Sequence, residues 1–155
     1  MHPNEELIDK FYRAFQQLDA ETMATCYAGD VQFSDPVFSN LQDTEATDMW
    51  RMLCSKAQNF SLTYDGVHAD DKIGEAHWIA TYTFSQTGRT VVNDIRASFI
   101  FKNGKIISHR DQFDLWKWAG QALGFKGLVL GWSPLMQNAI RAQAAKGLQI
   151  FRSKK

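Results

Sequence analysis

Hydrophobic residues recur at helical spacing through the first third of the chain. They predict three amphipathic helices: one behind Asn4 as its N-cap, one that begins at Asp19 and ends at Gly29, and one that begins after Asp43. The apolar positions of the first and third helices are Leu7, Phe11, Ala14, Phe15 and Leu18, and Ala46, Met49, Trp50, Leu53 and Ala57. A short extended segment lies between the second helix and the third.

From about residue 59 the hydrophobic period changes to two, which is typical of strands. Four alternating stretches cover about residues 59–68, 73–86, 90–102 and 105–116. They are separated by the turn residues Asp70-Asp71, Thr87-Gly88 and Asn103-Gly104, the last of which is a strong hairpin signal. The pattern predicts an antiparallel meander and, together with the helices, an α+β fold.

The C-terminal part begins with a glycine-punctuated link that contains Gly120, Gly124, Gly127 and Gly131. Ser133 and Pro134 then open a last amphipathic helix that reaches about residue 152. Its apolar stripe is Met136, Ala139, Ile140, Ala144, Gly147, Leu148 and Phe151. Because no linker or repeat divides the 155 residues, we predict a single domain.

Alternation also assigns the strand residues to two faces of the sheet. One face is hydrophobic except for Asn93, His109 and Asp111; its apolar members are Trp78, Ala80, Tyr82, Phe84, Val91, Ile95, Ala97, Phe99, Phe101, Ile107, Phe113 and Leu115. The other face, typical of a solvated or subunit-facing surface, carries Asp94, Arg96, Ser98, Lys102, Arg110, Gln112 and Asp114. A buried unsatisfied polar group costs about 1–3 kcal/mol. The three polar side chains must therefore find partners or line a cavity.

Asp35 lies within an apolar run, residues 31–38, directly before Pro36. Burial raises the pKa of a carboxyl group towards the range in which it can act as a general base at neutral pH. The alternative is an Asp that caps a turn before the proline. His109 has two readings as well: a core histidine bonded to a carbonyl or to Asp35, or an acid or base in a pocket.

Composition and charge exclude several classes of protein. No apolar run approaches the roughly 20 residues that span a bilayer, and the acidic N-terminus is unlike a signal peptide, so we expect a cytoplasmic protein. Cys26 and Cys54 lie in apolar helical patterns and are expected to be reduced core thiols. Residues 115–155 contain no acid and seven basic residues: Lys117, Lys126, Arg141, Lys146, Arg152, Lys154 and Lys155. These charges are interleaved with apolar residues, so we expect no nucleic acid partner.

Three N-terminal helices, the segment Phe-Ser-Asp-Pro-Val at 33–37 and a meander that ends at residues 104–114 follow one another in an order that resembles the SnoaL-like branch of the nuclear transport factor 2-like superfamily. This superfamily includes ketosteroid isomerases, limonene epoxide hydrolases and polyketide cyclases. The resemblance covers about residues 4–116. It implies a curved antiparallel sheet, with four main strands and a short extra strand, wrapped around three helices to form a conical apolar pocket. It implies no metal and no organic cofactor, and it favours a homodimer.

The resemblance also transfers to single positions. Asp35 stands where ketosteroid isomerases keep the Asp that shuttles a proton, but their oxyanion-hole Tyr and Asp correspond to Phe11 and Ala97 here. Asp111 stands where epoxide hydrolases of this fold keep an Asp, whereas residues 77–80 lack their Arg-x-Asp. SnoaL-type cyclases use a pocket Asp as acid and base in an aldol closure, a role open to Asp111 with His109.

The sequence therefore predicts a pocket for a small hydrophobic molecule, with Asp35, His109 and Asp111 as catalytic candidates and no metal. The substrate-binding candidates are Phe11, Phe15, Trp50, Trp78, Tyr82, Asn93, Ala97 and Phe113. Two functions stay open: a cyclase or isomerase that transfers protons on a carbonyl or polyketide-like compound, and a non-catalytic ligand-binding or dimerisation module. The extension, residues 117–152, is expected to close the cone, cover the convex face or form a dimer contact. A peripheral membrane contact through helix 134–152 is a further alternative.

Overall fold

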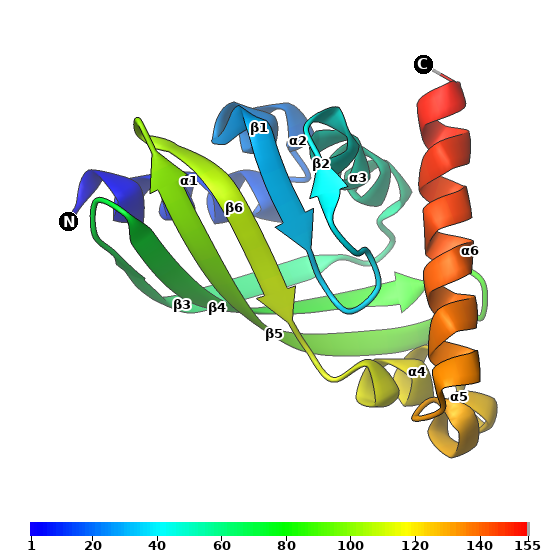
Figure 1. The fold of residues 1–155 in the computed structure, drawn as a ribbon. Helices are drawn as coiled ribbons and strands as arrows, with labels where there is room; N and C mark the ends of the chain where they lie inside the picture. The colour runs from blue at the N-terminus through cyan, green and yellow to red at the C-terminus, as the bar shows by residue number, and fades with distance from the viewer. Residues whose placement is uncertain (155) are drawn as a thin grey trace.

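The computed structural model describes residues 1–154, which form six helices and one sheet of six strands (Figure 1). The helices are α1 (Pro3–Gln16), α2 (Ala20–Thr25), α3 (Thr44–Lys56), α4 (Leu115–Leu123), α5 (Phe125–Leu130) and α6 (Pro134–Ser153). The strands are β1 (Tyr27–Ser34), β2 (Leu41–Gln42), β3 (Ser61–Ala69), β4 (Ile73–Phe84), β5 (Arg89–Lys102) and β6 (Lys105–Gln112). The predicted α+β fold is confirmed.

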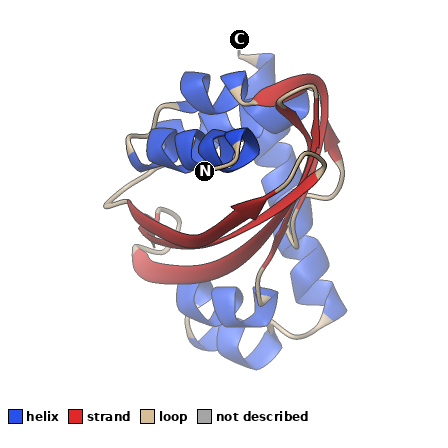
Figure 2. Ribbon diagram, turned by 90° about the vertical axis from the view of Figure 1, so that its left-hand side faces the viewer, coloured by secondary structure: helices blue, strands red, loops and turns tan. Residues whose placement is uncertain are grey.

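The strands are ordered β2-β1-β6-β5-β4-β3 across one open, curved sheet. The β1–β6 pair is parallel and every other neighbouring pair is antiparallel. The sheet wraps around α1, α2 and α3, while α4 and α5 lie beyond the end of β5 and α6 stands beside α3 (Figures 1 and 2). The α+β cone expected from the resemblance is thus present, and the predicted extra strand corresponds to β1 and β2.

Two helix boundaries differ from the prediction. The N-cap of α1 is His2, because Pro3 occupies the first helical turn and the His2 ring accepts the backbone N–H of Asn4. The Asn4 side chain instead donates to the carbonyl oxygen of Asp70 at 2.9 Å. The second helix ends at Thr25 rather than Gly29, because the chain from Tyr27 onward pairs with β6. Strand pairing here outweighs the helical pattern in the local sequence.

The strand faces follow the predicted alternation, with one exception. In β5 the odd-numbered residues from Val91 to Phe101 are all buried and the even-numbered ones are exposed. The register between β5 and β6 then shifts, so that Ile106 opposes Phe101 and Ser108 opposes Ile100. Ile106, rather than Ile107, therefore packs in the core, because the bulge turns the strand at this point.

The glycine-punctuated link is ordered as α4 and α5, and the last strand ends at Gln112 instead of continuing to residue 116. Asp114 stops the strand because its side chain accepts the N–H of Lys117 and caps α4. Gln121 in α4 then covers the open edge of β5: its amide accepts the N–H of Val92 at 2.7 Å and donates to the Val92 carbonyl at 3.0 Å. The side chain thereby replaces a missing strand partner.

The predicted last helix is confirmed as α6, which is held against the N-terminal part of the fold. Arg152 forms an ion pair with the buried Asp48 of α3 at 3.0 Å. Arg141 donates to the carbonyl oxygen of Pro36 at 2.8 Å, in the loop that carries Asp35. In residues 1–154, no helix combines the length and the hydropathy that a membrane crossing requires. Helix α6 is therefore held next to α3 and to the loop that carries Asp35.

Candidate functional site

A cavity of about 710 Å³ lies between the concave face of the sheet, the Asp35 loop and α6. Nine aromatic residues contribute to its wall: Phe15, Phe38, Trp50, Phe60, Trp78, Tyr82, Phe84, Phe113 and Trp118. The predicted stripe of α6 closes one side through Met136, Ala139, Ile140, Ala144 and Gly147. Part of the apolar stripe of α6 thus faces the cavity, which accounts for these positions of its amphipathic sequence.

Asp35 both forms the turn and faces the cavity. Its Oδ1 accepts the backbone N–H groups of Val37 at 2.7 Å and Phe38 at 2.6 Å, which fixes the loop after β1. Its Oδ2 receives no hydrogen bond from residues 1–154 and is not sealed from the cavity. One oxygen therefore positions the carboxyl group and the other is available to a ligand.

The surroundings of Asp35 shift its acidity strongly. The pKa of this carboxyl is raised to about 7, chiefly by burial, against the opposing effect of the Phe38 N–H and with a smaller contribution from the negative charge of Asp111. The hydrogen bond from Val37 lowers the pKa by a smaller amount. Burial thus outweighs two short hydrogen bonds, and the group can exchange a proton near neutral pH.

Asp111 is held by a buried chain of hydrogen bonds. Trp50 Nε1 donates to Tyr27 Oη at 2.9 Å, Tyr27 Oη lies 2.7 Å from His109 Nδ1, and His109 Nε2 lies 2.9 Å from Asp111 Oδ1. A neutral His109 with its proton on Nε2 satisfies every donor and acceptor, because the Tyr27 hydroxyl then donates to Nδ1. The chain fixes the carboxyl of Asp111, which also lines the cavity.

His109 itself lies behind the cavity wall, among aromatic rings. The centroid of its ring is 4.4 Å from that of Phe99, 5.1 Å from Phe33 and 5.5 Å from Phe11. Its partners are Tyr27 and Asp111, so both expected partners, a carbonyl and Asp35, were wrong. His109 is thus linked to the cavity through its contacts with Asp111 and Trp50, which both line it.

Two neutral polar groups face the cavity beside the carboxyl groups. Asn93 is 8% exposed and its side-chain amide makes no hydrogen bond with residues 1–154. The Tyr82 hydroxyl accepts a hydrogen bond from Trp118 Nε1 at 2.8 Å, which leaves its own proton to donate. Burial raises the pKa of Tyr82, so this proton is retained at neutral pH. In the β4–β5 pair Tyr82 opposes Val91 and Ala80 opposes Asn93, so the two groups are diagonal neighbours on one face.

Eight of the eleven site residues predicted from the sequence lie in the cavity wall: Asp35, Asp111, Phe15, Trp50, Trp78, Tyr82, Asn93 and Phe113. The predicted direct contact fails for His109, Phe11 and Ala97, which are fully packed in the core. Phe11 stacks on Tyr27 with centroids 5.4 Å apart. Ala97 is too short to pass its neighbours on β4 and β6, which are Ala76 and Asp111.

Among the residues not predicted for the site, Tyr27 and Trp118 form hydrogen bonds with predicted site residues. Tyr27 fell within the predicted second helix, although Tyr27, Val31 and Phe33 share one parity and are all buried in β1. Trp118 fell within the link. The alternation from Tyr27 to Phe33 was the available signal for the first, whereas nothing in the local sequence aims Trp118 at Tyr82.

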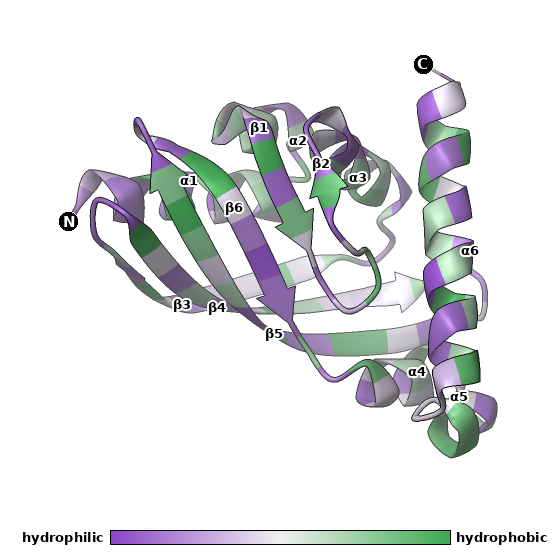
Figure 3. Ribbon diagram, in the orientation of Figure 1, coloured by the Kyte–Doolittle hydropathy of each residue, from purple (hydrophilic) through white to green (hydrophobic). Residues whose placement is uncertain are grey.

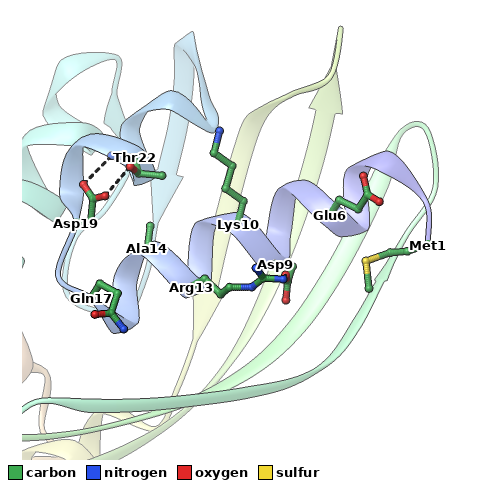
Figure 4. Close-up of a pocket in the computed structure, with 9 residues that line it drawn as sticks. All are labelled: Met1, Glu6, Asp9, Lys10, Arg13, Ala14, Gln17, Asp19 and Thr22. Carbon is green, nitrogen blue, oxygen red and sulfur yellow. Dashed lines mark hydrogen bonds and ion pairs between the residues drawn. The ribbon is translucent and has the colours of Figure 1, made fainter.

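A second hollow, of about 600 Å³, lies on the outer side of α1 and α2 (Figure 4). Its lining is mostly charged or polar: Met1, Glu6, Asp9, Lys10, Arg13, Ala14, Gln17, Asp19 and Thr22. Arg13 pairs with Asp9, and Asp19 caps α2 through Thr22. These side chains stabilise the two helices, and the hollow shares no residue with the aromatic cavity.

Residues 1–154 contain no group of three or more His, Cys, Asp or Glu side chains placed to hold a metal ion.

Comparison with known proteins places this geometry in a family. The sequence matches the family described as the SnoaL-like domain over residues 8–109, whereas no curated protein matches it. Its fold is similar to that of a protein with a ketosteroid isomerase-like fold from Catenulispora acidiphila, solved with trimethylamine. That pair has a TM-score of 0.68 and 13% identity over 83% of this chain and 98% of that chain.

Two further solved structures have the same fold. An epoxide hydrolase from M. tuberculosis described as LEH-like has a TM-score of 0.66 and 18% identity, over 83% of this chain and 96% of that chain. A proposed polyketide cyclase from Xanthomonas campestris has a TM-score of 0.65 and 18% identity, over 77% of this chain and 96% of that chain. These identities carry the fold and no single activity. With the family match spanning most of the chain, the protein belongs to the SnoaL-like domain family.

Proposed function

We propose that the protein is a cofactor-independent proton-transfer catalyst that acts on a small apolar carbonyl compound, as an isomerase or a polyketide-type cyclase. The observation that carries the proposal is the Asp35 carboxyl, with a pKa raised to about 7 and one oxygen available in an apolar cavity. A general base works best when its pKa lies near the working pH. An aromatic cavity of about 710 Å³ suits a small organic ligand.

Asp35 Oδ2 takes a proton from the carbon beside the carbonyl group. The electron pair of the broken C–H bond moves towards the carbonyl oxygen and gives an enolate. In an isomerase the substrate also has a carbon–carbon double bond, so the enolate is a conjugated dienolate and the proton returns to its more distant carbon. In a cyclase the enolate carbon attacks a second carbonyl group of the same molecule, a C–C bond forms, and the new alkoxide takes the proton from Asp35. Both routes return Asp35 to its carboxylate form.

The enolate oxygen requires hydrogen-bond donors, and loss of one such donor costs about 10²–10³ in rate in well-studied enzymes. The positions that supply them in ketosteroid isomerases are Phe11 and Ala97 here, and both are buried in the core. The Tyr82 hydroxyl and the Asn93 amide provide replacements, since both face the cavity from neighbouring strands. Asp111 contributes through its charge, which keeps the Asp35 pKa high.

The replacement of those two donors also favours a second candidate, a ligand-binding module without catalysis. Such a module would use the same aromatic wall and α6, and would leave the proton of the ligand in place. The two candidates separate when binding and proton exchange are measured on one ligand. The polyketide cyclase and epoxide hydrolase among the structural relatives support an apolar ligand in either case.

The test uses 2-tetralone, a bicyclic ketone with acidic protons beside its carbonyl group. Binding is followed by the fluorescence of the cavity tryptophans, and exchange of those protons in D₂O is followed by NMR. We expect exchange above the buffer rate with the wild-type protein and with Asp30→Asn, a change at an exposed Asp in β1, the strand that precedes Asp35. We expect Asp35→Asn to bind and to lose the added exchange. Binding without exchange by the wild type would favour the module, and equal exchange by Asp35→Asn would contradict the assigned base.

A further inference from the structure

Helix α5 buries a glycine and exposes its large apolar side chains. An amphipathic helix normally buries its large apolar residues, yet the one buried residue of α5 is Gly127. A Cβ atom at Gly127 would lie 1.9 Å from the carbonyl oxygen of Ala119, so only glycine lets α5 sit on α4 at this distance. The large side chains of α5 are consequently turned outward: Phe125, Leu128, Val129 and Leu130.

These side chains are part of a larger exposed surface, which we call the α4–α5 tip. It consists of Trp116, Phe125, Leu128, Val129, Leu130, Trp132 and Leu135. Phe125 is 79% exposed and Leu135 is 84% exposed. In Figure 3 the outer turn of α5 is strongly hydrophobic and projects from the end of the molecule below the sheet. Contiguous exposed apolar surface of this kind marks a contact site in a soluble protein.

The indole N–H groups of the two tryptophans of the tip are both hydrogen-bonded. Trp116 Nε1 donates to the Leu128 carbonyl at 2.9 Å, and Trp132 Nε1 donates to the Val129 carbonyl at 2.8 Å. Their indole N–H groups are therefore satisfied within the tip, and the ring faces are what it presents. These two side chains can enter an apolar medium without leaving an indole N–H unpaired.

The charges around the tip are positive. Lys117 and Lys126 lie on it, Arg89 packs beside Gly124, and Asp114, the cap of α4, is the acid nearest in sequence. Residues 115–155 contain seven basic residues and no acid. A symmetric dimer through the tip would bring two such surfaces together, with like charges opposed. A surface of negative charge with an apolar interior is the better match.

We propose that the α4–α5 tip docks on anionic lipid bilayers, with its apolar side chains in the interfacial region and Lys117 and Lys126 among the headgroups. Aromatic and aliphatic residues flanked by lysines are the composition of such interfacial contacts. The same segment borders the cavity through Leu123, Lys126 and Met136. Docking therefore places the cavity wall next to the bilayer, from which apolar ligands can be taken. The uptake of a ligand rests on the proposed function, whereas the docking does not.

The experiment is co-sedimentation of the full chain with vesicles of phosphatidylcholine that contain about one quarter phosphatidylserine. We expect binding that weakens at high salt, and at least about tenfold weaker binding for Phe125→Ser/Leu135→Ser. The matched control is Ile73→Ser, at a position that is 60% exposed at the start of β4. Lys117→Glu/Lys126→Glu is expected to weaken binding without removing any apolar area.

Three results would overturn the proposal. The first is no sedimentation of the wild type with anionic vesicles. The second is an equal loss of binding in Ile73→Ser. The third is a concentration-dependent dimer, seen by light scattering, that disappears in Phe125→Ser/Leu135→Ser, because the tip would then be a contact between copies of the chain. Unchanged circular dichroism of each variant shows that folding is retained. Because none of these readouts uses 2-tetralone, failure of the docking and failure of the proposed function are distinguishable.

Discussion

The raised pKa of Asp35 has a measurable effect on stability, which Asp35→Asn should remove. An ordinary Asp carboxyl titrates near 3.8, whereas the folded protein holds Asp35 at about 7. The folded state therefore binds this proton more tightly than the unfolded state does. The stability that it contributes is complete below about pH 4 and is lost as the pH rises to about 7.

The size of the effect follows from these two values. At pH 5 the unfolded state has already released its proton almost completely, while the folded state releases it only around pH 7. Linkage then makes the wild type about 2.5 kcal/mol less stable at pH 8 than at pH 5 through this group alone. The Asn amide oxygen can still accept the N–H groups of Val37 and Phe38. The variant should thus keep the turn, and its free energy of unfolding should lack the loss that the Asp35 carboxyl causes between pH 5 and pH 8.

Urea denaturation followed by tryptophan fluorescence, at pH 5 and pH 8, measures the difference. We expect Asp35→Asn to gain about 2.5 kcal/mol relative to the wild type on going from pH 5 to pH 8. Asp30→Asn is the control, because Asp30 is exposed in β1, the strand that precedes Asp35. If the wild type and Asp35→Asn lose stability in parallel over this range, the carboxyl is not desolvated and the account of the site is wrong.

Further predictions concern Asp111, Tyr27 and Gly127. Asp111→Asn should lower the pKa of Asp35, because it removes a negative charge that raises it, and NMR titration of the Asp35 carboxyl reads this directly. Tyr27→Phe should lower the free energy of unfolding, measured by urea denaturation, by about 1–3 kcal/mol, because it leaves His109 Nδ1 and Trp50 Nε1 unpaired. Tyr12→Phe is the control and should lower it little, since the buried Tyr12 hydroxyl has no partner in residues 1–154. Gly127→Ala should lower the melting temperature, because its Cβ would clash with Ala119. Gly147→Ala, in α6 with open space around it, should raise the melting temperature or leave it unchanged. Equal effects of Tyr27→Phe and Tyr12→Phe, or of Gly127→Ala and Gly147→Ala, would contradict the packing described.

The fold was largely accessible from the sequence, because burial in this protein follows simple periods. The alternation from Val91 to Phe101 placed Asn93 on the core face without any structure. The failures have local causes: the pairing of β1 with β6 overrides a helical pattern before Gly29, and a bulge exchanges Ile106 for Ile107. Neither can be read from residues that are adjacent in the chain.

The site was accessible only in part, for a similar reason. Alternation placed Asp111 and Asn93 on one face and so brought them near Asp35. It could not separate the residues of that face that reach the cavity from those that pack behind it, such as His109. Nor could it show that Tyr27 holds His109, because that contact joins positions far apart in the sequence. The outward face of α5 was hidden for a third reason, since it depends on how closely Gly127 approaches Ala119.

The most direct test of the central claim is an NMR pH titration of the Asp35 side-chain carboxyl in the wild-type protein, assigned by its absence from Asp35→Asn. The account predicts a carboxyl pKa of about 7, because burial and the charge of Asp111 outweigh the two turn hydrogen bonds. A midpoint near 4, the ordinary range for an Asp in water, would show that Asp35 only closes a turn, and would remove the base from the proposed reaction.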